Sequence, residues 1–252
     1  MINGTNGLIR AGTVALVTGA SSGFGAYFAR QLAEVGAKVA LAARRADRLE
    51  KLAAELPGSA AIQMDVESEA SIVAAFDAAE EKLGGVSILI NNAGMNAEGL
   101  AVDLPAEEFG RILRVNLTGP FLCAREAARR MIARKETEGR IVNVASIGAL
   151  KPLPGLAGYC ASKAGLVMLT KTLAREWANR GINVNALAPG YVATELNDEF
   201  LEREAGQKLI ASFPRRRLMQ ADDLGAMMLY LSSPLSAAVT GSVFTLDDGQ
   251  TL

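Results

Sequence analysis

A tyrosine and a lysine four positions apart are the first pair of side chains in this sequence that could do chemistry together. Tyr159 and Lys163 stand in the stretch Tyr-Cys-Ala-Ser-Lys, and this spacing places both on one face of a helix. An ammonium group beside a phenol favours the phenolate and lowers a pKa that starts near ~10. The pair could therefore donate and accept a proton near neutral pH. The same spacing also occurs on solvated helix faces, so the rest of the chain decides between the two interpretations.

Histidine is absent from the chain, so any proton transfer needs other residue types. This absence excludes a Ser-His-Asp triad and removes the commonest metal ligand. Ser146 ends an apolar stretch ahead of the tyrosine, where its hydroxyl could enter the same crevice or simply act as a cap. The two cysteines, Cys123 and Cys160, have no metal-ligand spacing, and we interpret Cys160 as a packing residue. We expect catalysis without a metal.

A glycine-rich loop near the N-terminus could bind phosphate. The apolar run 14–17 is typical of a buried parallel strand, and Gly19, Gly23 and Gly25 lead from it into a helical pattern at 26–32. Backbone N–H groups and the positive end of a helix dipole would meet there, close to a pyrophosphate. The spacing Gly-x-x-x-Gly-x-Gly differs from the best-known dinucleotide fingerprint. Because a strand precedes the loop and a helix follows it, we interpret it as a nucleotide site rather than an ordinary turn.

The elements that must position these groups alternate between strands and helices. We expect strands at 14–17, 38–43, 60–64, 86–90, 140–145, 182–187 and 242–246. Between them we expect helices, including long ones over about 105–134, with Pro105 in its first turn, and about 159–179. This order predicts an α/β fold: one domain over 1–252 with a doubly wound, Rossmann-like parallel sheet of about seven strands and helices on both faces.

In such a sheet ligands bind at the carboxyl ends of the strands. The strand ends that should converge on one crevice are Gly19, 43–44, Asp65, 91–94, Ser146 and 189–190. The candidate chemical groups therefore belong to one predicted site.

The composition excludes several functional classes. The 252 residues carry 26 basic and 27 acidic side chains, so net charge gives no basis for binding nucleic acid or a membrane surface. No apolar run approaches the ~18 residues of a membrane-spanning helix. Residues 1–11 lack the apolar run of a signal peptide, and two cysteines are too few for a disulfide framework. We expect a cytoplasmic protein.

In this combination the motifs resemble those of the short-chain dehydrogenase/reductase family, over almost the whole chain. Residues 18–25, Thr-Gly-Ala-Ser-Ser-Gly-Phe-Gly, match the family's cofactor loop, and 91–94, Asn-Asn-Ala-Gly, match its fourth-strand motif. Residues 189–190 with Thr194 match the segment that usually contacts the nicotinamide carboxamide. The positions that match the catalytic set are Asn116, Ser146, Tyr159 and Lys163.

The resemblance implies reversible hydride transfer between a nicotinamide and a carbonyl compound or alcohol. Tyr159 would protonate the carbonyl oxygen, and Ser146 would bind and orient it. Lys163 would hold the nicotinamide ribose and lower the tyrosine pKa, and Asn116 would help hold a water that connects Lys163 to solvent. The implied cofactor contacts are Gly19, Ser21, Ser22, Gly23, Phe24, Gly25, Arg44, Arg45, Asp65, Val66, Asn92, Ala93, Gly94, Tyr159, Lys163, Pro189, Gly190, Val192 and Thr194.

The end of the second expected strand bears on the choice of cofactor. An acidic residue there would bind a ribose 2′-hydroxyl and repel a 2′-phosphate. Ala43 occupies the position, and Arg44 and Arg45 follow, whose guanidinium groups match phosphate geometry. We therefore expect NADP(H), with NAD(H) as the alternative; the two arginines could otherwise simply begin an exposed helix. By resemblance, Asp65 would accept a hydrogen bond from the adenine amino group beside Val66.

The expected substrate is a small-molecule carbonyl compound or alcohol. The family's pocket would be formed here by Ile147, Ala149, Met95, Asn96 and 191–213, a mixed and fairly apolar lining. Within the family, both 3-oxoacyl thioester reductases and broad ketone or polyol dehydrogenases resemble this sequence. The sequence does not choose between them or set the direction of the reaction.

Other functional classes stay open. One is a sensor or scaffold that binds NADP(H) without turnover, against which the intact Ser146, Tyr159 and Lys163 argue. The epimerases and dehydratases that share Tyr-x-x-x-Lys carry an additional C-terminal region that we do not find. The family implies a homodimer or homotetramer built on the two long helices. Four arginines on one helix could form a solvated face, a subunit contact or a docking site for an acidic carrier protein, namely Arg125, Arg129, Arg130 and Arg134.

Overall fold

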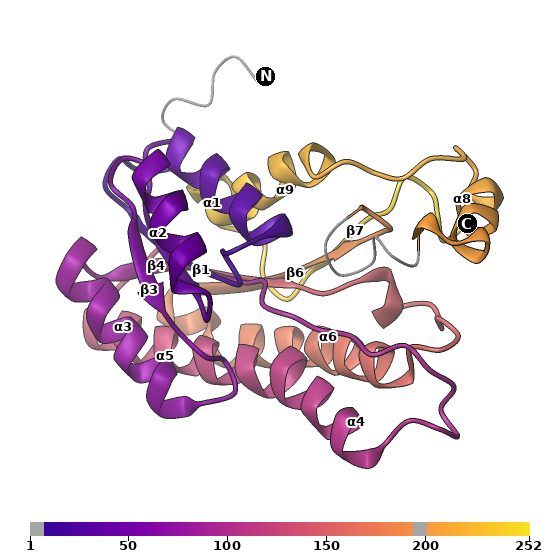
Figure 1. Cartoon of the computed structure of the whole chain (residues 1–252). Helices are drawn as coiled ribbons and strands as arrows, with labels where there is room; N and C mark the ends of the chain where they lie inside the picture. The colour runs from indigo at the N-terminus through magenta and orange to yellow at the C-terminus, as the bar shows by residue number, and fades with distance from the viewer. Residues whose placement is uncertain (1–7, 194–200) are drawn as a thin grey trace.

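The computed structural model describes residues 8–193 and 201–252, in which helices cover both faces of a central sheet (Figure 1). The sheet has seven strands in the order β3-β2-β1-β4-β5-β6-β7. Every neighbouring pair is parallel. The predicted doubly wound α/β class is confirmed. The strand order reverses between β1 and β4, and a crevice for ligands opens at such a point.

The strands agree with the expected ranges and differ only at their ends. They are β1 Val14–Thr18, β2 Lys38–Ala43, β3 Ala60–Gln63, β4 Val86–Asn91, β5 Gly139–Val144, β6 Ile182–Pro189 and β7 Val243–Leu246. Every residue of β1, β5 and β6 is buried, including the polar residues Arg140, Asn143, Asn183 and Asn185 of β5 and β6. These central strands carry the site at their carboxyl ends.

Two apolar cores fill the space between the sheet and its helices. The helices are α1 Gly23–Glu34, α2 Ala46–Glu55, α3 Glu69–Leu83, α4 Ala106–Leu113, α5 Gly119–Ala133, α6 Ala157–Trp177, α8 Glu204–Ser212 and α9 Asp222–Ser232. On one face α1, α2 and α9 bury Phe28, Leu49 and Leu224, and on the other α3 and α5 bury Phe76 and Met131 (Figure 1). The sheet is therefore held rigidly from both sides.

The long helix expected over 105–134 is found over residues 106–133, but it contains an irregular turn that the sequence did not indicate. α4 and α5 are joined by a π-helical turn, Arg114–Thr118, with the fully buried Asn116 at its centre. Pro105 caps α4 with an extended backbone (φ −60°, ψ 139°) and does not belong to its first turn. A single π turn within a helix is frequent at functional sites.

The four arginines of α5 are paired with acidic side chains. Ion pairs join Arg125 to Glu69, Arg130 to Asp77, Glu80 and Glu126, Arg134 to Glu80, and Arg129 to Glu126. Most of these carboxylates lie on α3, so the arginines tie two helices together. Because the chain itself neutralises them, they offer little attraction to an acidic carrier protein. In the part of the chain that the structure describes, no helix is long and apolar enough to cross a membrane.

Candidate active site

The carboxyl ends of β1, β2, β4, β5 and β6 surround one cavity of about 480 Å³. Among the predicted site residues, its lining contains Gly19, Ser21, Ser22, Gly23, Phe24, Arg44, Arg45, Asp65, Val66, Asn92, Ala93, Gly94, Ser146, Tyr159, Lys163, Pro189, Gly190 and Val192. Gly25 and Asn116 are buried and do not line the cavity. Thr194 lies outside the described residues. The structure thus brings the expected strand ends together.

The loop after β1 and the loop after β4 form one closely packed unit. The Thr18 hydroxyl accepts hydrogen bonds from the backbone N–H groups of Asn92 and Ala93, both at 2.9 Å. Gly19 has a left-handed backbone (φ 67°), and a Cβ there would lie 2.9 Å from the Ala93 Cα. A Cβ on Gly25 would lie 2.2 Å from the Gly19 carbonyl oxygen. Two of the glycines therefore serve the close packing of these loops.

The glycine loop and α1 provide donors that fit a phosphate group. The helix begins at Gly23, and no acidic residue stands in its first turn. Ser21 and Ser22 line the cavity directly ahead of it. Free N–H groups and the positive end of the helix dipole favour an anion at this point. This end of the cavity fits the pyrophosphate of a dinucleotide.

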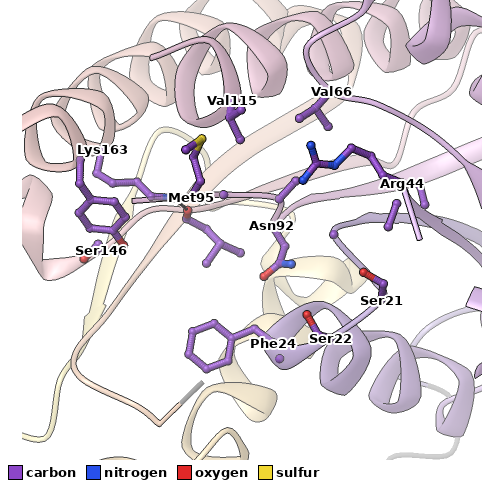
Figure 2. A pocket seen from close by; sticks show the side chains of 18 of the residues that line it. Ser21, Ser22, Phe24, Arg44, Val66, Asn92, Met95, Val115, Ser146 and Lys163 are labelled. Atoms are coloured by element: carbon purple, nitrogen blue, oxygen red, sulfur yellow. Dashed lines mark hydrogen bonds between the residues drawn. The ribbon is translucent and has the colours of Figure 1, made fainter. Parts of the chain in front are cut away.

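The two arginines after β2 have different surroundings. The Arg45 guanidinium donates to the Ser21 hydroxyl from Nε (3.1 Å) and Nη2 (2.9 Å), and to the Ser22 hydroxyl from Nη2 (2.7 Å). Figure 2 shows the Arg44 side chain extending into the cavity near Val66. Within the described residues its guanidinium has no hydrogen bond or ion pair. Arg44 is therefore the arginine available to an added anion, and Arg45 braces the loop.

Ser146, Tyr159 and Lys163 meet at the other end of the cavity. Figure 2 shows Ser146 and Lys163 far from Ser21 and Arg44. The Ser146 hydroxyl accepts from the Gly148 N–H at 3.0 Å and lies close enough to the Tyr159 hydroxyl to affect its pKa. Lys163 Nζ donates to the Val144 carbonyl at 2.7 Å and lies 5.7 Å from the centre of the Tyr159 ring. The serine and tyrosine oxygens can therefore bind the same oxygen of a substrate.

Burial dominates the ionisation of this group. Desolvation of the hydroxyl raises the pKa of Tyr159, and the nearby Ser146 only partly offsets this rise. Burial lowers the pKa of Lys163 to about 8. The expected lowering of the tyrosine pKa by the lysine is thus not found: burial raises the pKa, and the group that lowers it is Ser146, not Lys163. At neutral pH Tyr159 is an uncharged phenol, ready to donate a proton.

Asn116 acts on the site through its hydrogen bonds. Its Oδ1 accepts from the Met95 N–H at 2.8 Å, and its Nδ2 donates to the Met95 carbonyl at 2.8 Å and to the Ser162 hydroxyl at 3.0 Å. Both amide hydrogens are used within the protein, and the water expected beside Asn116 stays a prediction. What it does is tie the loop after β4 to the helix that carries Lys163.

Sequence motifs did not identify every residue of the cavity wall. The additional lining residues are Ala42, Ala43, Met64, Glu67, Met95, Arg111, Val115, Val144 and Ala145. Met64 and Ala145 end expected strands, and Met95 was expected on the substrate side, so their position could have been inferred. Arg111 and Val115 reach the cavity from α4 and its π turn, for which no motif gives a signal.

Comparisons with known proteins agree with this geometry. A family model described as enoyl-(acyl carrier protein) reductase matches residues 19–251. D-threitol dehydrogenase of Mycolicibacterium smegmatis is 37% identical over 245 residues, which cover 96% of this chain and 94% of that protein. The 3-oxoacyl-[acyl-carrier-protein] reductase of Rickettsia bellii is 35% identical over 242 residues, 94% of this chain and 96% of the relative.

Solved structures of dehydrogenases also resemble this chain over nearly its whole length. A gluconate 5-dehydrogenase from Burkholderia cenocepacia, crystallised with NADP and tartrate, has a TM-score of 0.92 and 34% sequence identity, with 98% of each chain covered. The fold, the shared cavity and these relatives point to one conclusion. The chain belongs to the short-chain dehydrogenase/reductase family of oxidoreductases.

Proposed function

We propose that this chain is an NADP(H)-dependent enzyme that interconverts a carbonyl group and a secondary alcohol in a small molecule, with Tyr159 as general acid and base. The observation that carries the proposal is that Ser146, Tyr159 and Lys163 line the same cavity, with Lys163 Nζ 5.7 Å from the centre of the Tyr159 ring. When bound, the nicotinamide would donate or accept the hydride. Proton transfer falls to the side chains of the protein.

In the reductive direction Tyr159 donates its proton to the carbonyl oxygen, and Ser146 holds the same oxygen by a hydrogen bond. The raised pKa of Tyr159 keeps that proton in place at neutral pH. Lys163, fixed by the Val144 carbonyl, would hold the nicotinamide ribose beside the tyrosine ring. In the oxidative direction the phenolate form of Tyr159 would take the proton of the alcohol.

The preference for NADP(H) is supported by the wall of the cavity at the end of β2. Ala43 places no carboxylate there, and the Arg44 guanidinium extends into the cavity (Figure 2). An arginine recognises a 2′-phosphate, whereas a carboxylate would repel it. The gluconate 5-dehydrogenase with a similar fold was crystallised with NADP.

The names of the relatives suggest which substrates to try. They include a polyol dehydrogenase and a reductase of carrier-bound 3-oxoacyl groups. We propose a polyhydroxy compound or a 3-oxoacyl thioester as the substrate. We also propose that residues 1–252 form one domain, supported by the single sheet, and that the protein forms a dimer or tetramer, supported only by the family resemblance.

The test is a panel of ketones, oxidised sugar acids, polyols and 3-oxoacyl thioesters, followed by NADPH absorbance for wild type and Tyr159→Phe. The phenylalanine variant should lose about 10²- to 10⁴-fold in kcat, because it lacks the general acid. Its affinity for NADPH should change by less than about twofold, since the hydroxyl is assigned to the substrate oxygen.

Tyr230→Phe is the matched control, because Tyr230 lies on α9 and does not line the cavity. It should keep wild-type turnover. A Tyr159→Phe enzyme that retains more than about a tenth of the wild-type rate would show that another group supplies the proton.

A further inference from the structure

The chain after β7 turns back onto the end of β6, which lines the cavity. Asp248 (φ 53°) and Gly249 (φ 80°) are two consecutive residues with left-handed backbone, so the turn is tight. The next residue, Gln250, is only 4% exposed, although it lies at the C-terminal edge of the chain. A polar side chain so deeply buried needs hydrogen-bond partners.

Those partners are the two backbone groups of Tyr191. Gln250 Oε1 accepts from the Tyr191 N–H at 2.6 Å, and Nε2 donates to the Tyr191 carbonyl at 3.3 Å. Gly190 allows this approach, because a Cβ there would lie 2.4 Å from Gln250 Oε1. A glutamine amide suits the position because it offers a donor and an acceptor without charge.

Further contacts hold the glutamine itself in place. The Asp247 carboxylate accepts from the N–H groups of Gly249 (3.1 Å) and Thr251 (2.9 Å), on either side of Gln250. The Asp248 carboxylate receives Arg217 Nε at 2.8 Å and Arg215 Nε at 3.1 Å. The turn is therefore fixed both internally and to the segment before α9.

The same segment also contacts the Tyr191 side chain. Its ring stacks on Phe213, with 5.6 Å between the ring centres and 30° between the planes. The Met219 N–H donates to the Tyr191 carbonyl at 3.0 Å. Gly190 and Val192, which flank Tyr191, both line the cavity, and Tyr191 is close enough to influence the ionisation of Tyr159. The position of Tyr191 thus fixes one wall of the cavity relative to the general acid.

We propose that Gln250 is a positioning residue for the reaction. Its amide holds the backbone of Tyr191 and so fixes segment 189–192 against Tyr159, although Gln250 itself does not line the cavity. The inference rests on the proposed function, in which segment 189–192 lies beside the nicotinamide and the substrate. The adenosine half of the cofactor would be bound at the other end, near Arg44. Removing the hydrogen bonds of Gln250 should therefore weaken binding at the nicotinamide and substrate end of the cavity more than binding at the adenosine end.

The test compares wild type with Gln250→Met, which keeps the length of the side chain and loses both hydrogen bonds. Gln220→Ala is the control, because Gln220 is exposed and does not line the cavity. Amide hydrogen exchange of Tyr191 is measured by NMR on the ligand-free protein. Exchange should become about tenfold faster in Gln250→Met, the equivalent of one hydrogen bond.

Two functional readouts follow. KM for a carbonyl substrate from the panel should rise about tenfold, with a smaller change in kcat. The Kd for adenosine 2′,5′-bisphosphate, a cofactor fragment without nicotinamide, should stay within about twofold. A general loss of structure would weaken both, so the unequal response separates positioning from unfolding.

Unchanged exchange at Tyr191, or faster exchange with unchanged KM, would overturn the inference. If Gln250→Met does not fold, Gln250→Asn replaces it, because the shorter amide cannot reach Tyr191, and the same outcomes apply. A wild type without turnover on the whole panel would refute the proposed function, while the exchange measurement would still decide whether Gln250 holds Tyr191.

Discussion

Replacing Arg44 by alanine is the sharpest test of the cofactor assignment. Its guanidinium extends into the cavity and has no partner within the described residues, so a 2′-phosphate would gain a new charge-assisted contact (Figure 2). Such a contact contributes roughly 1.5–3 kcal/mol. At ~1.4 kcal/mol per decade, its loss should lower kcat/KM for NADPH about ten- to a hundredfold. Because Arg44 is exposed and its charge is screened, we expect the lower end of that range.

The neighbouring Arg45 gives an internal comparison. Its hydrogen bonds to Ser21 and Ser22 brace the loop that would bind the pyrophosphate, which NADPH and NADH share. Arg45→Ala should therefore weaken both cofactors, whereas Arg44→Ala should weaken NADPH and leave NADH nearly unchanged. The ratio of the two efficiencies separates the roles.

The assay is kcat/KM for NADPH and for NADH at one fixed ionic strength, for wild type, both single variants and the double variant. Lys51→Ala is the matched control, because it removes one exposed positive charge from α2 and does not line the cavity. A wild type that prefers NADH, or an Arg44→Ala enzyme with an unchanged ratio, would refute the assignment. If Lys51→Ala changed the ratio of the two kcat/KM values equally, the cause would be the overall electrostatic potential of the surface and not a contact made by Arg44.

Two further predictions concern pH and metals. Burial lowers the pKa of Lys163 from 10.5 to about 8, so between these values the unfolded chain binds more protons there and stability rises with pH. Between about pH 7.5 and pH 9.5 wild type should gain on the order of 2 kcal/mol relative to Lys163→Met in urea unfolding, and parallel curves would contradict this. Activity should survive prolonged dialysis against EDTA, because the chain has no histidine and its described residues contain no group of three potential metal ligands. A loss of activity restored by a divalent ion would refute that expectation.

The fold could be predicted because its signals are local. Residues 14–17 are an unbroken apolar run, and in 182–187 the apolar residues are interrupted only by Asn183 and Asn185; each stretch becomes a fully buried strand. The glycines of the loop after β1 likewise indicate a sharp turn from the sequence alone. The positions where strands end followed from the same runs, and with them the residues that line the cavity.

The electrostatics of the site could not be predicted in this way. The spacing of Tyr159 and Lys163 places them one turn apart, but the lysine amine is directed to the Val144 carbonyl and desolvation dominates both pKa values. Desolvation depends on all the elements that surround a group, so no short motif encodes it. Arg44 and Arg45 are a second example. They are adjacent residues of the same type, but in the folded chain Arg45 binds Ser21 and Ser22 while Arg44 extends into the cavity, and the sequence does not distinguish the two.

The two ends of the cavity are aligned by contacts between segments that lie far apart in the sequence. Thr18 binds the loop at Asn92 across 74 residues of sequence, and Gln250 binds Tyr191 across 59. The groups that would touch a cofactor or substrate lie in short motifs, because the proposed reaction needs these side chains at a fixed spacing. The groups that align them lie wherever the sheet brings two strand ends together. Changes in the motifs should therefore abolish turnover, and changes such as Gln250→Met should shift KM while the chemistry remains, because they move one wall of the cavity and leave every reacting group in place.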